Sequence, residues 1–194
     1  MAKVQMGPGT SIYPMPTLLV GANVDGKPNF MTVAWGNIAN AEPPMAAVAI
    51  RVKRYTRIGI EQNKTFSINI PSADLVKEAD YCGIVSGAKA DKVQACQFTV
   101  FYGKLGTAPM IEQCPINLEC SVVHSLELGS HTLYVGRIEE VHVSSDCLTG
   151  GRIDLDKVKP LAYLEDPSRQ YHTMGELQGK AFSIGLEIKG KEKT

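Results

Sequence analysis

The sequence predicts a mainly β protein, an antiparallel barrel with a few helical insertions. Short runs rich in strand-forming residues recur along the chain, turn-forming Gly, Pro and Asp residues separate them, and only one long segment has helical periodicity. A parallel sheet would instead require strands and helices that alternate regularly. We therefore expect an antiparallel barrel.

The clearest local signal is a hairpin near the N-terminus. Residues 17–24 are mostly apolar, Asp25-Gly26 follows, and residues 27–35 form a second strand-like run. Asp-Gly suits a tight turn whose central residues need positive φ angles. Two further strands are expected, at residues 45–52 and 66–70.

Three helices are expected in the middle of the chain. Thr56 could cap a short helix over residues 57–63. The longest helix is expected at residues 72–85, where Ser72 is a good N-cap and apolar residues recur at helical spacing. Residues 91–96 are expected to form one more short helix.

The strand pattern returns after these helices. Residues 118–125 and 131–144 are rich in β-branched residues, and Gly129-Ser130 makes a turn between them. Residues 181–188 are expected to form a last strand. Residues 190–194 are expected to be a polar, solvated tail.

Composition excludes several classes of protein. The chain has 194 residues, of which 44% are hydrophobic, and its 20 basic and 20 acidic residues cancel. One domain over residues 1–194 is expected, with disorder and general nucleic-acid binding disfavoured. The apolar stretch at residues 45–50 is far too short to span a membrane, and the N-terminus lacks an apolar signal region. We expect a cytoplasmic protein whose five cysteines are reduced thiols.

Strong catalytic and metal motifs are absent from the sequence. It contains no Gly-rich dinucleotide fingerprint, no phosphate-binding P-loop and no HExxH or GxSxG motif. The spacing of Cys114, Cys120, His124 and His131 matches no common structural zinc site. These four residues are expected to be ordinary strand residues, and no metal site is expected.

Two polar stretches are compatible with binding of an anion. Residues 51–57 place four cations, Arg51, Lys53, Arg54 and Arg57, around Thr56 at an expected helix start. Residues 82–92 combine Gly83 and Gly87 with further lysines, and glycines let backbone amides approach a ligand. Taken singly, these stretches also fit a solvated basic loop and a glycine-capped surface loop. Together they suggest that two loops hold one anionic group, such as a phosphate.

An ordered series of segments resembles a known family. The series spans residues 13–175 and includes Pro14-Met-Pro16, Val20–Trp35, Pro43-Pro44, Arg54-Tyr-Thr56, Phe66–Ile70, Asp80–Gly87 with Asp91-Lys92, Leu118-Glu-Cys120 and Gly129–Gly136. Each segment alone is unspecific, but their order over more than 120 residues is specific. The chain thereby resembles the flavin reductase-like, FMN-binding split-barrel proteins, in particular their flavoredoxin branch.

The resemblance implies a Greek-key split β-barrel that forms a homodimer and binds FMN without a covalent bond. It implies ring contacts from the strand after the Asp-Gly hairpin, partly through backbone groups, and phosphate contacts from the two polar loops. Asn69 would reach the ribityl chain or the ring edge, or else face solvent as a polar strand residue. The expected cofactor-binding residues are Asn29, Met31, Thr32, Val33, Ala34, Trp35, Arg51, Lys53, Arg54, Thr56, Asn69, Cys82, Gly83, Ser86, Gly87 and Lys92.

The resemblance leaves several functions open. The chain could carry electrons from a redox-protein partner, or it could act as an NAD(P)H-dependent flavin oxidoreductase. His131 would then help position a hydride donor or an electron partner, although a lone strand histidine is more often only half-exposed structure. Trp35 could stack near a flavin or simply fill the core. A non-catalytic ligand-binding or sensor barrel for FMN or heme is the alternative, and a pyridoxamine-phosphate oxidase-like relative fits less well.

Overall fold

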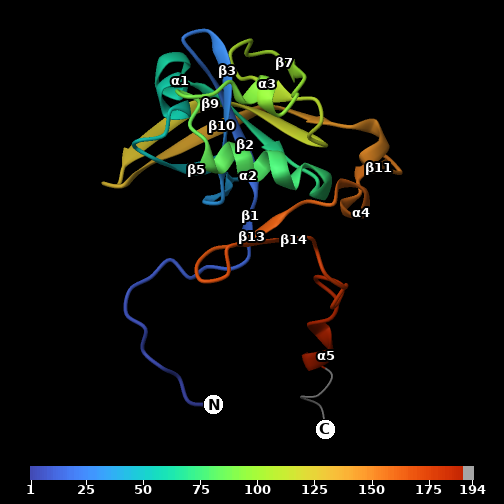
Figure 1. Ribbon diagram of the computed structural model, residues 1–194. Helices are drawn as coiled ribbons and strands as arrows, with labels where there is room; N and C mark the ends of the chain where they lie inside the picture. The colour runs from blue at the N-terminus through green and yellow to red at the C-terminus, as the bar shows by residue number, and fades with distance from the viewer. Residues whose placement is uncertain (190–194) are drawn as a thin grey trace.

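A curled, seven-stranded antiparallel sheet forms the body of the protein in this computed structural model, which describes residues 1–189 (Figure 1). The strand order is β3-β2-β6-β9-β10-β5-β4. The strands are β2 (Leu18–Val24), β3 (Lys27–Val33), β4 (Gly36–Asn40), β5 (Met45–Arg51), β6 (Thr65–Ile70), β9 (Ile116–Glu127) and β10 (His131–Val143).

The two edges of this sheet are joined directly by the chain. Strands β3 and β4 lie at opposite edges, yet only Ala34 and Trp35 separate them. Such a short link brings the edges together, so the sheet must curl on itself. We call this junction of β3 and β4 the seam. Beside it, the Trp35 carbonyl accepts a hydrogen bond of 2.8 Å from the Ala49 amide, which extends the pairing of β4 with β5. The expected split-barrel fold class is therefore confirmed.

The N-terminal hairpin forms as the sequence predicts. Asp25 and Gly26 have φ angles of 51° and 78°, and Val24 pairs with Lys27. Both central residues thus adopt the positive φ values of a primed turn. The second strand ends at Val33 instead of residue 35, because the chain bends there to cross the seam.

Three helices cover the outside of the barrel near β2 and β3. Helix α1 (Thr56–Asn63) packs on β2, whereas α2 (Val76–Ile84) and α3 (Lys92–Ala95) pack on β3. The helix expected at residues 72–85 begins as a 3₁₀ turn, Ala73–Leu75, before α2. Asp91 caps α3 by accepting a 3.0 Å hydrogen bond from the Gln94 amide. Of the helices in residues 1–189, none has the length and apolar character needed to cross a bilayer.

A small sheet lies at the lower end of the barrel in Figure 1, where the chain enters and leaves the body. It consists of β1 (Met15–Pro16), β13 (Ala162–Leu164) and β14 (Gln170–His172). Residues 1–14 and 173–188 on either side are exposed. The remaining short elements are β7 (Val100–Phe101), β8 (Met110–Ile111), η2 (Ser145–Cys147), β11 (Leu148–Thr149), β12 (Arg152–Ile153), α4 (Leu155–Val158) and α5 (Leu186–Lys189).

The strand predicted for residues 181–188 is wrong. Residues 181–185 form turns, in which the Ser183 and Ile184 amides donate to the Lys180 carbonyl, and α5 follows. An alternating sequence becomes a strand only when another strand pairs with it, and these residues are exposed on all sides. The tail expected at residues 190–194 lies outside the described residues.

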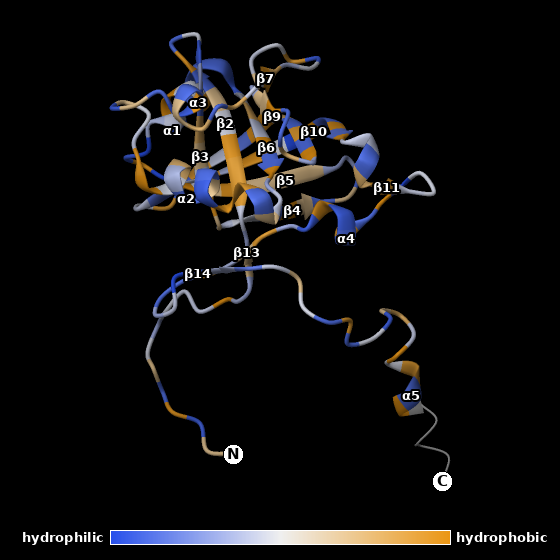
Figure 2. Ribbon diagram, turned by 45° about the vertical axis from the view of Figure 1, so that its right-hand side comes forward, coloured by the Kyte–Doolittle hydropathy of each residue, from blue (hydrophilic) through white to orange (hydrophobic). Residues whose placement is uncertain are grey.

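Two apolar clusters hold the body together. One fills the barrel, with Phe66, Val20, Ile50 and Tyr134 among its members. The other lies between the sheet and the outer helices and includes Leu19, Phe30, Ala79 and Phe98. Strand β2 contributes to both, which is why it is buried along its whole length and hydrophobic in Figure 2. The site described below is therefore built on a rigid strand pair.

Asn69 is the centre of a buried hydrogen-bond network that links several strands. Its side-chain amide donates to the Leu19 carbonyl and to Ser67 Oγ, at 2.8 and 2.9 Å. Its side-chain oxygen accepts from the Ile111 amide at 3.0 Å and from Asn117 Nδ2 at 2.8 Å. All four hydrogen-bonding positions of Asn69 are thus used inside the protein. This fully buried side chain joins β2, β6, β8 and β9.

We expect Asn69→Ala to lower the free energy of unfolding by at least about 3 kcal/mol, since each buried polar group left without a partner costs roughly 1–3 kcal/mol. Urea denaturation would measure the loss, with an unchanged m-value. The matched control is Asn37→Ala, at an exposed strand position; it should change stability by less than about 0.5 kcal/mol. Equal effects of the two substitutions would contradict the assignment.

Candidate functional site

A cleft runs along the outer face of β3 and across the seam. It consists of two adjoining cavities of about 290 and 300 Å³ that share Thr32, Ala34 and Arg54. The first also has Met31, Val33, Trp35, Ala49, Arg51, His131 and Glu165 in its walls. The second adds Thr17, Asp80, Gly83, Ile84, Tyr163, Arg169 and Tyr171.

Successive side chains of β3 point to opposite faces of the sheet, and this determines which of them face the cleft. Met31 and Val33 turn their side chains into the barrel cluster, so Thr32 and Ala34, on the opposite face, form the floor. Thr32 Oγ1 donates to the Ala79 carbonyl of α2, which fixes that side chain. The floor is therefore a flat surface of small side chains and backbone. Met31 and Val33 can therefore offer only backbone groups to a ligand in the cleft.

Trp35 and His131 form one wall of the cleft. Their rings stack with centroids 4.6 Å apart and planes inclined by 27°. The Nδ1 atom of His131 shares a 2.9 Å hydrogen bond with Ser130 Oγ. Burial and the neighbouring Arg51 cation lower the pKa of His131, and Glu165 opposes this change. The histidine ring is therefore neutral at neutral pH.

Of the three arginines that line the cleft, Arg169 is paired with Asp166, so Arg51 and Arg54 supply the positive charge that is open to an anion. Arg51 is exposed and pairs with His131 across β5 and β10, whereas Arg54 is half-buried and donates to the Gly83 carbonyl at 2.8 Å. Burial, followed by repulsion from Arg51, lowers the pKa of Arg54. An anion placed between them would offset both effects on Arg54, because it attracts both cations and stabilises the partly desolvated one.

The two polar loops lie against each other. In addition to the Arg54–Gly83 hydrogen bond, Gly87 packs so closely that an added Cβ would lie 1.9 Å from Asn29 Oδ1 and 2.9 Å from the ring of Tyr55. Only glycine fits at this contact. The loops border another cavity, of about 440 Å³, which Asn29, Gly87 and Lys92 line together with Lys27 and Lys89.

Asn29 and Thr56 bind each other. The Asn29 amide donates to Thr56 Oγ1 at 2.6 Å, and both side chains are buried. Thr56 is the first residue of α1 and not its N-cap; Tyr55 occupies the cap position, without a side-chain cap hydrogen bond. The predicted capping role of Thr56 is therefore wrong, because its hydroxyl accepts from β3 instead. This bond fixes the basic loop against β3.

The side-chain ammonium group of Lys92 already binds two backbone carbonyls of the protein. It is 3% exposed, and its Nζ donates to the carbonyl oxygens of Phe30 and Cys82, at 2.9 Å each. Burial lowers its pKa. The lysine thus ties the second loop to β3 and α2, and its contribution to an anion site is chiefly to hold that loop in place.

Four further expected site residues do not line the cleft. All hydrogen-bonding positions of Asn69 are used in the buried network described above, and Cys82 is buried in the outer cluster. Lys53 and Ser86 are exposed in their loops, close in sequence to Arg54 and Gly87. The structure therefore brings together Met31, Thr32, Val33, Ala34, Trp35, Arg51, Arg54, Gly83 and His131 in one place.

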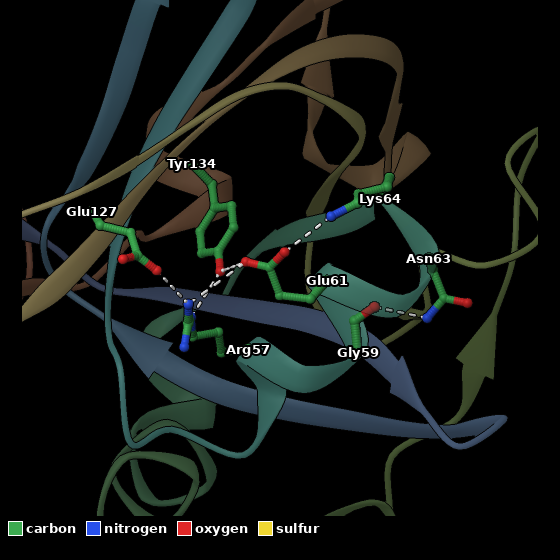
Figure 3. Close-up of polar contacts among 7 residues, drawn as sticks. All are labelled: Arg57, Gly59, Glu61, Asn63, Lys64, Glu127 and Tyr134. Carbon is green, nitrogen blue, oxygen red and sulfur yellow. Dashed lines mark hydrogen bonds and ion pairs between the residues drawn. The ribbon is translucent and has the colours of Figure 1, made fainter.

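Arg57 belongs to a separate polar cluster (Figure 3). It donates to the Tyr134 hydroxyl and to Glu127, at 3.1 Å each, and Tyr134 donates to Glu61, which also pairs with Lys64. Burial and the hydrogen bond to Glu61 raise the pKa of Tyr134 to about 12. Carboxylates already neutralise Arg57, so the basic stretch offers only Arg51, Lys53 and Arg54 to an anion.

Several cleft residues could not be predicted from the sequence. Glu165 and Tyr163 are two of these, and both come from the C-terminal hairpin. Tyr171 of the same hairpin, which lies within the series that carries the family resemblance, donates to Asp80 of α2 at 3.1 Å. Thr17 Oγ1 is buried at the cleft and has no hydrogen-bond partner within residues 1–189. A polar edge of a bound ligand would satisfy this atom, so the cleft fits a flat molecule with polar edges and an anionic group.

A split barrel with this cleft at its seam is the architecture of flavin-binding redox domains. The sequence matches the flavin reductase like domain family over residues 10–172. The chain belongs to this family, and the resemblance seen in the sequence is confirmed.

Solved structures and a curated relative agree with this assignment. Flavoredoxin from Methanosarcina acetivorans is 42% identical, with a TM-score of 0.92 over 97% of this chain and 100% of that one. Flavoredoxin of Desulfovibrio vulgaris (Miyazaki F) is 38% identical, with a TM-score of 0.87 over 95% and 100%. The NADH-dependent flavin reductase of a Rhodococcus species is 30% identical over 52% of each chain.

Proposed function

We propose that this protein is an FMN-dependent electron carrier of the flavoredoxin type. The observation that carries the proposal is the cleft, which joins a flat floor of backbone and small side chains to a pair of arginines. A bound flavin accepts and donates one or two electrons. The protein would supply the orientation of the ring, a partly dry environment and an anchor for the phosphate.

The arrangement of charge favours FMN over FAD. Arg51 and Arg54 form one compact cationic seat beside the exposed Lys53, and a terminal phosphate dianion matches this cluster better than a diphosphate that continues into an adenosine. Thr32 and Ala34 would lie under the ring, and Thr17 Oγ1 would meet one of its polar edges. Arg54 would bind the anion while still holding Gly83.

A carrier role is favoured over release of reduced flavin. The likeness to flavoredoxins extends over nearly the whole chain, whereas that to the curated flavin reductase covers about half of it. Two interlocked loops around the anion seat also suit a cofactor retained through many turnovers. Reduction by NAD(P)H is a second route, supported by the stacked His131 at the cleft wall, where a neutral ring could position a nicotinamide.

A homodimer would cover the surface next to this wall. A mostly apolar cavity of about 540 Å³ adjoins the cleft and is lined by residues of the N-terminal arm, among them Ile12 and Pro14, together with Trp35, Ala47 and Leu133. A second copy would remove these groups from water and shield the Trp35 side of the cleft.

We expect Arg51→Ala to bind FMN at least about 10-fold more weakly, because a charge-assisted contact worth roughly 1.5–3 kcal/mol is lost. Fluorescence titration of the apoprotein with FMN, FAD and riboflavin would measure this. Riboflavin, which lacks the phosphate, should lose little affinity, and wild-type protein should prefer FMN to FAD. Arg152→Ala, at an exposed position on β12, is the control. Equal losses for FMN and riboflavin would refute the phosphate seat.

The electron donor can be tested by stopped-flow reduction of the bound flavin. We expect a reduced iron–sulfur protein to bleach it quickly and His131→Ala to leave that rate unchanged. If NADH or NADPH also reduces it, His131→Ala should slow that step by about 10-fold, which corresponds to ~1.4 kcal/mol. Because the pKa of His131 is lowered, the nicotinamide rate should not change between pH 7 and 8. Rapid reduction by nicotinamide alone would favour the reductase instead.

Sedimentation equilibrium at micromolar concentration should give twice the chain mass of 21.0 kDa. Leu133→Glu, which places a charge in the apolar cavity, should shift the protein toward monomer, because burying an unpaired charge at an interface is costly. Leu155→Glu, at an exposed position on α4, is the control. A monomer with flavin still bound would exclude the dimer.

A further inference from the structure

Residues 173–189 form a C-terminal arm that leaves the small sheet and projects away from the barrel. Figures 1 and 2 show this arm well apart from the body and from the N-terminal residues. Residues 173–188 are exposed, and they include six large apolar side chains: Met174, Leu177, Phe182, Ile184, Leu186 and Ile188. So much exposed apolar surface on one short segment is typical of an interaction site.

The outer part of the arm is a turn that presents Phe182. The Ser183 and Ile184 amides donate to the Lys180 carbonyl at 3.3 and 3.0 Å, and α5 begins at Leu186. Phe182 has a φ angle of 58° and is fully exposed. A positive φ is unfavourable for a bulky residue, and so is an aromatic ring surrounded by water. A conformation with both of these costs indicates a contact outside the single chain.

The path of the arms is shared with a solved structure. Residues 1–14 and 173–189 together make up about a sixth of the chain. A TM-score cannot exceed the fraction of residues that superpose, so the score of 0.92 against the Methanosarcina acetivorans flavoredoxin requires part of the arms to superpose as well. Chain ends keep a defined path when something ties them down. The exposed arm therefore needs a surface that holds it.

A surface of matching chemistry lies next to the cleft. It is the mostly apolar cavity of about 540 Å³ that has Ala47 and Leu133 in its walls. This volume is typical of pockets that hold a whole ligand, so the cavity can accept an aromatic ring. Ala34, Trp35 and Ala49 line both this cavity and the cleft. A side chain in the cavity would therefore contact Trp35 and border the cleft on that side.

We propose that the C-terminal arm is exchanged between two copies of the chain, so that Phe182 of one protomer occupies the apolar cavity beside Trp35 of its partner. The inference rests on the homodimer proposed above and assigns the segment that joins its subunits. About ten residues link Phe182 to β14, and when extended they span roughly 33 Å, about twice the radius of gyration expected for a domain of this size. Twofold symmetry gives two such contacts per dimer, and each cleft is complete only with the arm of the partner.

Photo-crosslinking of the apoprotein identifies where the arm lies. When the photoreactive p-benzoylphenylalanine replaces Phe182 in the 194-residue chain, irradiation should give a covalent species of twice the 21.0 kDa chain mass. Trypsin cleaves after Lys and Arg but not before Pro, so the walls of the cavity fall in the peptides of residues 4–51 and 105–137. The link should lie in one of these two peptides. A cross-linked product of single chain mass would place the arm on its own barrel and overturn the proposal.

Trp35 reports whether the cavity is filled, because it is the single tryptophan of the chain and is half-buried. Phe182→Glu should shift its emission to longer wavelength, increase quenching by acrylamide and weaken dimerisation at least about 10-fold, since a charge is costly in an apolar cavity. Phe182→Leu keeps an apolar side chain and should retain both the emission and the dimer. Ile153→Glu, at an exposed position on β12, is the matched control.

The outcomes separate the arm from the dimer and from the flavin. A Phe182→Glu protein that dimerises as well as wild type, with unchanged Trp35 emission, would overturn the exchange of the arm while the homodimer stands. A monomeric wild type would overturn both. Because these measurements contain no flavin, neither result bears on the proposed FMN site, which the titrations described above test separately.

Discussion

The two-residue link between β3 and β4 is the constraint on which the rest of the structure depends. Because Ala34 and Trp35 alone connect opposite edges of a seven-stranded sheet, the sheet must close there. The link needs backbone freedom and a bend, so strand pairing stops and the barrel wall opens to solvent. The cleft occupies this opening, and residues from β3, β5 and β10 meet in it. The same feature thus produces both the fold and the candidate binding site.

Polar side chains then fix the loops around the seam. Asn29 binds Thr56, Arg54 binds Gly83, and Lys92 binds Phe30 and Cys82 through their carbonyls. Each bond joins segments far apart in the sequence and is at least partly buried, where hydrogen bonds are strongest. A cation that holds a loop in place is preorganised, so less conformational entropy is lost when a ligand arrives. Within residues 1–189, the exposed side chain of Arg51 forms no such hydrogen bond to a loop.

Much of this arrangement could be predicted from the sequence, because strands and turns depend on local patterns. The Asp25-Gly26 hairpin, the strands of the barrel and the two polar loops follow from alternation and turn chemistry. The partners of polar side chains do not. Nothing local indicates that Asn69 makes four buried hydrogen bonds or that Lys92 is 3% exposed, since both depend on partners elsewhere in the fold. Residues 181–188 mislead for the related reason that alternation cannot reveal a missing strand partner.

The hairpin of β13 and β14 supplies the far wall of the cleft, yet none of its residues is fully buried. Apart from strand pairing with β1, the Tyr171–Asp80 hydrogen bond joins it to α2. Segments with so little buried surface open at low free-energy cost, well before the barrel unfolds. Ligand exchange would then follow the opening frequency of this hairpin and not the strength of the contacts on the floor. Residence time and equilibrium affinity at this cleft would be set by different parts of the chain.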